Sequence, residues 1–419
     1  MSEKKLPLDS SELIRFAKTA GTPFHIYDGD AIKTNIRSMA EAFSWADGFI
    51  NYFAVKALPN ISILRLIAAE GFGADCSSLP ELKLASEAGF SPDRIMFSSN
   101  DTADEEFLEA FRMGAIINLD DITHIDDVIR VCGRLPETIS FRFNPGRERT
   151  GNAIIGNPVE AKYGVTHEQL IPCYERARQE GVRHFYLHTM VASNELNEDY
   201  IVETARMLFS LVREIYEQTG IIIEQVDLGG GIGIPYRPED EAISFTSLSE
   251  RIRQVYEDLI EKTGRKLRIS FECGRCITGP YGWLVSTVRH VAHKYKDYVG
   301  LDSTMADLMR PALYGAYHHI TVAGKENEKA DHVYDVTGSL CENNDKFAVD
   351  RSLPEIEKGD ILVIHDTGAH GHAMGFNYNA KMRHAEYLIE NGEIYRIRRD
   401  ETYEDYVRTQ LARPEKIIY

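Results

Sequence analysis

Four kinds of chemically capable residue stand at separate points of the chain, each directly after a short apolar run. Lys56 follows NYFAV, His188 follows HFYL, Glu272 follows RISF, and the glycines 229–231 follow EQVDL. A lysine amine kept near apolar surroundings can attack a carbonyl carbon, a carboxylate can hold a proton on a basic nitrogen, and glycine amides can bind an anion. Each of these residues, taken alone, is commonly structural. Whether they are functional depends on where the fold places them relative to one another.

The elements that would position these residues alternate between residues 50 and 272. Eight short apolar runs are each followed by an amphipathic segment, which predicts strands at 49–55, 73–76, 95–98, 115–119, 139–143, 184–189, 224–228 and 268–272. The segment SSLPELKLASEAG carries helix signals, with Ser78 and Glu81 at capping-box spacing and Gly89 at the C-terminal cap. Eight strand and helix pairs predict an α/β fold with a closed (β/α)8 TIM-type barrel.

The active site of such a barrel lies at the carboxyl ends of its strands, so the residues that close each strand should meet. In chain order these residues are Lys56, Asp75, Arg142, His188, Gly229, Gly230, Gly231 and Glu272. A cofactor with an aldehyde and a phosphate would use them together. Lys56 would form a Schiff base and the glycine turn would bind the phosphate, while Glu272 would keep a ring nitrogen protonated and His188 would stack on the ring. The pattern therefore predicts pyridoxal 5'-phosphate.

The pattern changes after about residue 277. The segments WLVSTVRHVAHKY, HVYDVTG, DILVIHDTG and AEYLIENGEIYRIRR indicate longer strands with hairpin turns, and Asn391-Gly392 is a two-residue turn signal. We expect two domains, a barrel over 31–276 and an antiparallel β domain over 277–419. Residues 1–30, with the strand-like TPFHIYD, could join either unit and are assigned to the β domain.

The amino-acid composition limits the kinds of partner and the location that we expect for this protein. A net charge of −18 argues against nucleic acid or an anionic membrane surface, and no window approaches the roughly 20 apolar residues of a membrane span. The start MSEKKLPLDS has no apolar core of a signal peptide, so we expect a cytoplasmic protein. Cys273 and Cys276 form a CxxC without the second pair that zinc needs, and no metal site is expected.

Several segments in order resemble one family over nearly the whole chain. They are YFAVKALPN, GADCSSLPEL, FRFNPG, LGGGIGIPY, ECGR, RPALYGAYHHI, CENNDKFAVDRSLP and FNYNAKMR. They resemble the fold type III pyridoxal phosphate decarboxylases, whose architecture is alanine racemase-like, and most of all the diaminopimelate decarboxylase branch. The resemblance implies a carboxy-lyase of lysine biosynthesis that converts meso-diaminopimelate to L-lysine and carbon dioxide, acting as a head-to-tail homodimer with shared active sites.

The same resemblance implies further site residues. Gly274 and Arg275 would contact the cofactor, and Tyr378 would lie near its phosphate and the substrate. Arg275 would also contact substrate carboxylates, together with Arg310 and Tyr314. Cys341 and Glu342 would come from the partner subunit, with Cys341 as the proton donor to the carbon that has lost carbon dioxide. Two arginines suit a substrate with two carboxylates, because a planar guanidinium can donate two parallel hydrogen bonds to one carboxylate.

The sequence departs from the family pattern in four places. HTMVASN replaces HIGS after the sixth strand, so the phosphate-binding serine is displaced to Ser193 or lost. ECGR has Cys273 where the family has proline, and CENND has Asn343 and Asn344 where the family has small, serine-like residues. GAHG has His370 where tyrosine is usual. The first and last departures leave the substrate open.

Three other functions therefore stay open. The first is a related decarboxylase acting on D-ornithine, D-lysine or arginine, which needs one carboxylate contact fewer. An amino-acid racemase can share the barrel and lysine but needs a base on each face of the α-carbon, and the CENND and RPALYG segments argue against it. A non-catalytic homologue is disfavoured because Lys56, Glu272 and Cys341 are all present.

Overall fold

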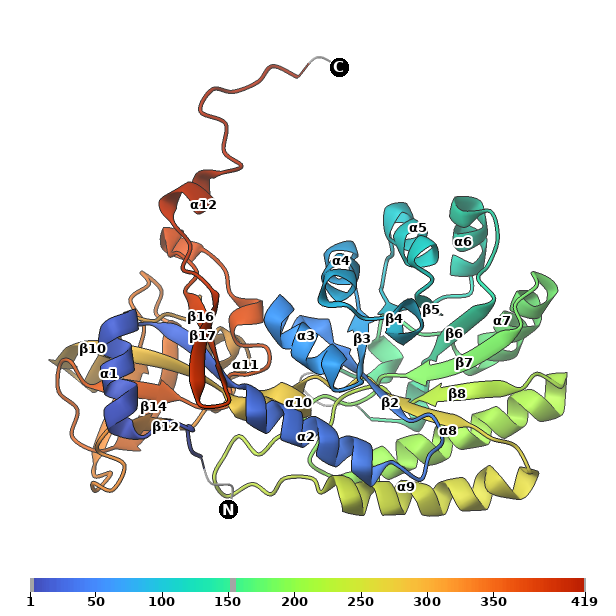
Figure 1. Cartoon of the computed structure of the whole chain (residues 1–419), viewed down its shortest axis with the longest axis horizontal. Coiled ribbons are helices and arrows are strands. Elements are labelled where there is room, and N and C mark those ends of the chain that lie inside the picture. The colour runs from blue at the N-terminus through green and yellow to red at the C-terminus, as the bar shows by residue number, and fades with distance from the viewer. Residues whose placement is uncertain (1–3, 151–155, 418–419) are drawn as a thin grey trace. The chain divides into compact units, whose positions relative to one another are not determined.

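The computed structural model describes residues 4–150 and 156–417, and the chain divides into two compact units. Among the described residues, the first unit runs from 29 to 280, and the second joins residues 4–28 to residues 281–417 (Figure 1). In the described part of the chain, no helix has both the length and the apolar character needed to span a membrane.

A closed barrel of parallel strands forms the centre of the first unit. Its strands are β2 (Ile50–Ala54), β3 (Gly73–Cys76), β4 (Ile95–Ser98), β5 (Ile116–Leu119), β6 (Thr138–Phe143), β7 (His184–Thr189), β8 (Ile223–Asp227) and β9 (Arg268–Phe271). Pairing of β2 with β9, Asn51 opposite Phe271, closes the ring. Every strand lies within one residue of its predicted position, and the TIM-type barrel is confirmed.

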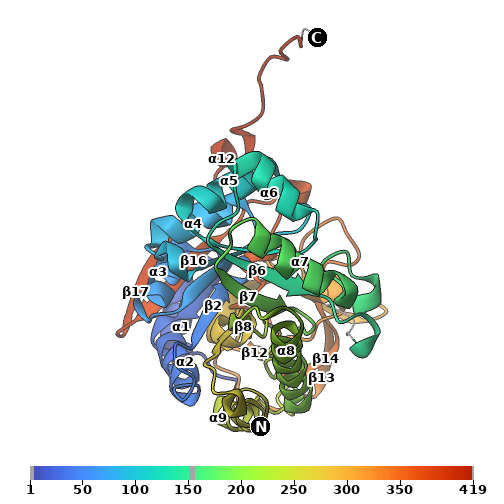
Figure 2. The ribbon, with the colours of Figure 1, turned by 90° about the vertical axis from the view of Figure 1, so that its right-hand side faces the viewer.

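Helices surround the strands, as Figure 2 shows. They are α2 (Gly29–Ala42), α3 (Ile61–Ala69), α4 (Leu79–Ala88), α5 (Asp104–Met113), α6 (His124–Cys132), α7 (His167–Gln179), α8 (Glu198–Thr219), α9 (Phe245–Leu259) and the short α10 (Arg275–Thr278). The signals around α4 act as predicted: Ser78 accepts from the Glu81 amide, and Gly89 ends the helix at φ +95°. The Glu81 carboxylate, however, caps the amide of Ser77 rather than that of Ser78.

The barrel interior is layered because inward side chains recur every second residue of a strand. One apolar layer contains Tyr52, Met96, Ile116 and Tyr186. Two residues further along the strands, toward their carboxyl ends, the inward residues become polar: Ser98, Asn118 and His188. The apolar layer thus forms a floor beneath a polar mouth.

The second unit is built on one mixed β-sheet. Its strands are β1 (Phe24–Asp28), β10 (Gly282–His293), β11 (Asp297–Leu301), β12 (Ile320–Val322), β13 (His332–Thr337), β14 (Lys346–Leu353), β15 (Ile361–Ile364), β16 (Ala385–Glu390) and β17 (Glu393–Arg398), and its helices are α1 (Ser10–Ala20), α11 (Arg310–Tyr314) and α12 (Tyr403–Val407). The main path runs β14-β13-β11-β10-β1-β16-β17. Most pairs are antiparallel as expected, but β1 with β16 and β11 with β13 are parallel.

Two local predictions in this unit can be checked directly. The TPFHIYD segment forms β1, which pairs with β10 and β16 and so belongs to the β domain. The Asn391-Gly392 turn joins β16 to β17 with positive φ angles of 51° and 77°, which is the conformation that a type I′ hairpin requires.

Candidate active site

Lys56 lies at the carboxyl end of β2, on a single turn of 3-10 helix, Val55–Ala57. Its neighbours Val55 and Ala57 are fully buried, whereas the Lys56 side chain is 54% exposed at the mouth of the barrel. Its Nζ is 3.7 Å from Asp75 Oδ2 on the adjacent strand β3. The negative charge of Asp75, and after it that of Glu272, raises the pKa of Lys56. The amine therefore stays protonated more strongly than an ordinary lysine.

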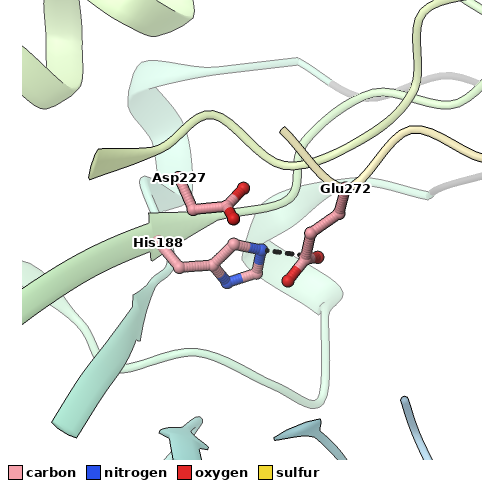
Figure 3. Close-up of side chains that lie close together, drawn as sticks. All are labelled: His188, Asp227 and Glu272. Carbon is pink, nitrogen blue, oxygen red and sulfur yellow. Dashed lines mark ion pairs between the residues drawn. The ribbon is translucent and has the colours of Figure 1, made fainter. Parts of the chain in front are cut away.

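Glu272 follows β9 directly, and its carboxylate is held at both oxygens. Oε2 lies 3.0 Å from His188 Nε2 (Figure 3). Oε1 accepts a hydrogen bond of 3.1 Å from Ser98 Oγ. Burial alone would raise the pKa of Glu272, but contact with His188 and the positive charges of Lys56 and Arg142 lower it below its usual range. Glu272 is therefore a buried carboxylate that stays ionised.

His188 is fixed in one tautomer by Asn118. The Asn118 side-chain amide donates to His188 Nδ1 at 2.9 Å and also reaches Ser98 Oγ at 2.9 Å. Because Nδ1 accepts, the proton of the neutral imidazole sits on Nε2, which faces Glu272. Burial lowers the pKa of His188, which favours the uncharged ring, and the Asn118 hydrogen bond sets its orientation.

Asp227 ends β8 and shapes the glycine turn that follows. It accepts from the Gly229 amide at 2.8 Å and from Ser270 Oγ at 2.8 Å, and burial raises its pKa. A Cβ on Gly230 would lie only 2.6 Å from the Glu272 backbone oxygen, so this position requires glycine. Asp227, His188 and Glu272 have ligand atoms within 4.8 Å of one another, but the Asp227 carboxylate is already engaged in holding the turn.

Arg142 closes β6 in register with His188 on β7. Its guanidinium stacks on the Tyr163 ring, 3.7 Å from the centroid, and burial lowers its pKa. Tyr163 belongs to the segment that returns from the loop after β6. Stacking keeps a second cation at the mouth and ties this segment to the strand end.

Gly274 and Arg275 continue from Glu272 into α10. A Cβ on Gly274 would lie 2.7 Å from Ala57 Cβ, so the turn that carries Lys56 packs directly on this glycine. Arg275 donates to the hydroxyl of Tyr236 and lies at the start of α10. Ser193 lies half-buried in the segment after β7. In the same segment, the Met190 sulfur accepts a hydrogen bond from the Gly230 amide of the glycine turn.

The predicted site residues of the second unit fall into two groups. In the first, the Cys341 amide donates to Asn379 Oδ1 at 3.2 Å, which brings the Cys341 and Tyr378 segments side by side. Cys341 and Tyr378 are exposed, and Glu342 is partly buried. The buried Asp345 accepts from the amides of Leu340 at 2.7 Å and Met305 at 2.6 Å, and so holds the turn that presents Cys341.

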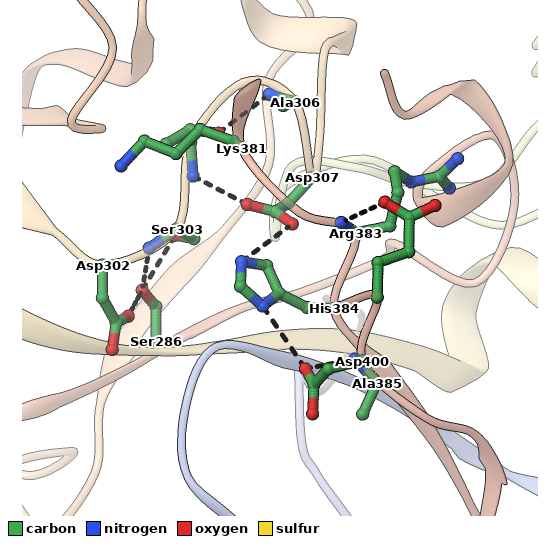
Figure 4. A network of polar contacts seen from close by, with 12 residues as sticks. Ser286, Asp302, Ser303, Ala306, Asp307, Lys381, Arg383, His384, Ala385 and Asp400 are labelled. Carbon is green, nitrogen blue, oxygen red and sulfur yellow. Dashed lines mark hydrogen bonds and ion pairs between the residues drawn. The ribbon is translucent and has the colours of Figure 1, made fainter. Parts of the chain in front are cut away.

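A polar network fixes the chain beyond Tyr378 (Figure 4). His384 lies between two carboxylates, 3.8 Å from Asp307 and 3.5 Å from Asp400. The amides of Arg383 and Ala385 donate to Glu401 at 2.8 Å and Asp400 at 3.0 Å. This network anchors the carboxyl end of the Tyr378 segment within its unit.

The second group lies on α11. Arg310 is 97% buried, and its guanidinium donates to His318 Nε2 at 2.8 Å. His318 Nδ1 in turn donates to the His365 backbone oxygen at 2.8 Å, so Nε2 is left as an acceptor for the arginine. Tyr314, one turn later, is 48% exposed.

The residues at the barrel mouth suit a phosphorylated aldehyde with a basic ring. The exposed amine, the ionised carboxylate and the glycine turn are the three groups such a molecule requires, and they converge. Buried polar atoms without a hydrogen-bond partner also gather here, including Asp75 Oδ1 and Asn118 Oδ1.

Four residues of the site were not predicted from the sequence: Ser98, Asn118, Asp227 and Tyr163. The first three could have been found by following the alternate, inward-facing positions to each strand end.

Comparison with known proteins gives a consistent result. The family model for the pyridoxal binding domain of pyridoxal-dependent decarboxylases matches residues 30–279. Protein TabA of Pseudomonas amygdali pv. tabaci is 41% identical, over 94% of this chain and 92% of its own. The diaminopimelate decarboxylase of Methanothermobacter thermautotrophicus is 33% identical, over 97% and 95%. The crystal structure of diaminopimelate decarboxylase from M. jannaschii with L-lysine superposes with a TM-score of 0.89 at 31% identity, over 96% and 95%.

Proposed function

This chain belongs to the pyridoxal-dependent decarboxylases, and on that premise we propose that it decarboxylates meso-diaminopimelate to L-lysine. Its cofactor is pyridoxal phosphate, which we assign to the barrel domain over residues 31–276. The observation that carries the proposal is the meeting of the Lys56 amine, the ionised Glu272 and the glycine turn at one barrel mouth.

Pyridoxal phosphate supplies, when bound, an aldehyde for an amino group and an electron-withdrawing ring. The chain's own residues prepare the site for this chemistry. Lys56 Nζ presents the amine, and Asp75 keeps it charged until the proton is released. Glu272 would hold a proton on a basic ring nitrogen, since a carboxylate whose pKa is lowered stays ionised beside it. His188 offers an uncharged flat face whose tilt Asn118 fixes.

The substrate assignment rests on relatives and on charge. Several diaminopimelate decarboxylases share about a third of their residues with this chain over nearly its full length, and the related M. jannaschii enzyme was crystallised with L-lysine. We assign Arg275, Arg310 and Tyr314 to the substrate carboxylates. The chain is more similar to Protein TabA, whose name states no substrate. Other amino acids are therefore compared with diaminopimelate in the experiment described below.

We further propose that the enzyme is a head-to-tail homodimer in which each subunit's Cys341 and Glu342 serve the neighbouring barrel. Cys341 is exposed on a turn that Asp345 holds rigid, which suits a group that acts on another chain. A cleft of about 700 Å³ lies beside it, lined in part by Ser339, Asn343 and Lys381, and offers a surface for a second copy. The Cys341 thiol would then supply the proton to the carbon that has lost carbon dioxide.

We also place the enzyme in the cytoplasm. All six cysteines are free thiols in the structure, which is typical of a reducing compartment.

Carbon dioxide release by the cofactor-loaded protein tests the function. The substrates to compare are meso-diaminopimelate, D-lysine, D-ornithine, L-ornithine and L-arginine. Turnover of diaminopimelate alone would support the proposal. Preference for a substrate with one carboxylate would overturn the substrate but leave the reaction class, and chiral analysis of the amino acid would reveal a racemase.

Mixing two inactive variants tests the shared site. Lys56→Ala and Cys341→Ala each remove one half of the proposed site, so each homodimer should be inactive. Random reassortment would give half of the dimers one complete site, and thus about a quarter of the wild-type activity. No activity after reassortment would contradict shared sites, provided that mixed dimers are detected by a size or affinity tag.

A further inference from the structure

The segment after β7, Met190–Glu195, is bound tightly to the glycine turn after β8. Glu195 and Gly231 are joined by an amide-to-oxygen hydrogen bond of 2.8 Å, and the Gly233 amide donates back to Glu195 at 2.8 Å. Asn194 Oδ1 accepts from the Ile234 amide at 3.1 Å. The two loops therefore form one structural piece, which fixes the backbone of Met190 beside the turn.

The Met190 side chain lies across the first two glycines. Its Sδ accepts a hydrogen bond from the Gly230 amide at 3.2 Å, and a Cβ on Gly229 would be 3.2 Å from the same sulfur. An amide of a glycine-rich turn is the kind of donor that a phosphate oxygen takes. A thioether is a much weaker acceptor. The sulfur thus lies where an anion oxygen bonded to Gly230 would lie.

Two neighbouring amides of the same loop have oxygen acceptors, which are stronger than a thioether. The Gly229 amide donates to Asp227 at 2.8 Å, and the Gly233 amide donates to Glu195 at 2.8 Å. Methionine is unbranched and can change rotamer at little cost. Of the amides of Gly229, Gly230 and Gly233, that of Gly230 is therefore the one whose partner an anion can displace most readily.

We propose that Met190 is a displaceable cap of the phosphate subsite. Its thioether holds the Gly230 amide in the cofactor-free protein and swings aside when the cofactor phosphate takes that donor, so Met190 lowers the affinity for pyridoxal phosphate. The proposal rests on the cofactor assignment and is independent of the substrate. Met190 stands within HTMVASN, the segment where this chain departs from the family's HIGS.

Equilibrium dialysis of the cofactor-free full chain tests this proposal. Met190→Ala removes the cap, and Met190→Leu keeps its bulk but cannot accept a hydrogen bond. Pyridoxal phosphate should bind Met190→Ala roughly 3- to 10-fold more tightly than wild type, the worth of one weak hydrogen bond, with Met190→Leu in between. Pyridoxal, which lacks the phosphate, should bind all three proteins equally, and inorganic phosphate should compete better in the alanine variant.

Two outcomes would overturn the proposal. One is unchanged or weaker binding of pyridoxal phosphate by both variants, which would make Met190 a structural support of the turn. The other is an equal gain for pyridoxal, which would place the effect away from the phosphate. Met190→Leu keeps the test usable if the alanine variant folds poorly. Because dialysis reads cofactor binding alone, a wrong substrate assignment would leave these results unchanged.

Discussion

Glu272 and His188 face each other at 3.0 Å between Oε2 and Nε2, although they come from strands β9 and β7, which are separated by β8. The contact joins a buried carboxylate whose pKa is lowered to an imidazole whose pKa burial also lowers. This pairing allows one carboxylate to orient a ring and to hold a proton on a nitrogen opposite it.

Replacing Glu272 with glutamine should abolish most activity. An amide keeps the shape of the side chain but carries no charge to hold a ring nitrogen protonated, so kcat should fall by about 100-fold or more. Dialysis should show pyridoxal phosphate still bound, since Lys56 and the glycine turn remain. Glu81→Gln, which removes a more distant carboxylate from the same mouth, is the matched control. Wild-type turnover in Glu272→Gln would contradict the assigned role.

Asn118 should act as a positioning residue through His188. Asn118→Asp replaces a donor with an acceptor opposite Nδ1, so the imidazole proton should move to Nδ1 and the pKa of His188 should rise. Nitrogen NMR of the labelled ring would reveal the tautomer, and the pH profile of turnover should change shape. Asn118→Ala, which offers neither donor nor acceptor, separates the loss of a bond from its reversal. An unaltered ring spectrum in Asn118→Asp would refute this account.

The strand ends could be predicted because apolar runs and their closing residues are local signals. Lys56, His188 and Glu272 were each found in this way, and the barrel brings them together. Ser98 and Asn118 were missed because they carry no charge, and only a count of alternate inward-facing positions along each strand identifies them. Met190 was missed because it carries no charge, and its role depends on a loop that approaches from another strand.

The second unit was harder to predict than the barrel. The strands β11, β12 and β14 were not predicted, and the parallel partners of β1 and β11 are far away in sequence. Such pairings depend on long-range packing, which alternation within one strand does not encode. The hairpin at Asn391-Gly392 was predictable because its two residues adopt positive φ by themselves.

Asp75 should control the pH at which Lys56 captures the cofactor. Only the neutral amine attacks an aldehyde, and Asp75 is the first cause of the raised pKa of Lys56. The rate of pyridoxal phosphate capture should therefore rise with pH in the wild type, and Asp75→Asn should shift this profile toward lower pH. Stopped-flow absorbance with cofactor-free protein measures the rate. Glu81→Gln should shift it less, and coincident wild-type and Asp75→Asn profiles would rule out the role.

Asp345 should matter for turnover but not for cofactor binding. Asp345→Ala leaves the Leu340 and Met305 amides without their acceptor, so the turn that carries Cys341 should lose its fixed geometry. A displacement of about 1 Å in a reacting group can lower the rate about 100-fold. Dialysis should give an unchanged affinity for pyridoxal phosphate. Asn344→Ala, an exposed neighbour, is the control, and full activity in Asp345→Ala would show that the turn does not position Cys341.

His25 should make the protein less stable in mild acid. It is fully buried on β1, its Nε2 donates to the Asp307 backbone oxygen at 3.2 Å, and its Nδ1 has no hydrogen-bond partner. Burial lowers its pKa from 6.5 to about 3, so the unfolded chain binds a proton between these values while the folded chain does not. The stabilisation from His25 is therefore complete above pH 6.5 and is lost as the pH falls, by about 1.4 kcal/mol per unit.

His25→Asn removes this proton from the unfolded state and isolates the effect. Between pH 7 and pH 5, the loss of unfolding free energy in urea should be smaller in His25→Asn than in the wild type by up to about 2 kcal/mol. Comparing slopes rather than absolute stabilities allows for any packing that the substitution costs. His293→Asn, at a histidine that is 73% exposed, should keep the wild-type slope. If His25→Asn also kept it, the acid sensitivity would have to come from other buried groups, of which His365, with a pKa of about 3, is the next to test.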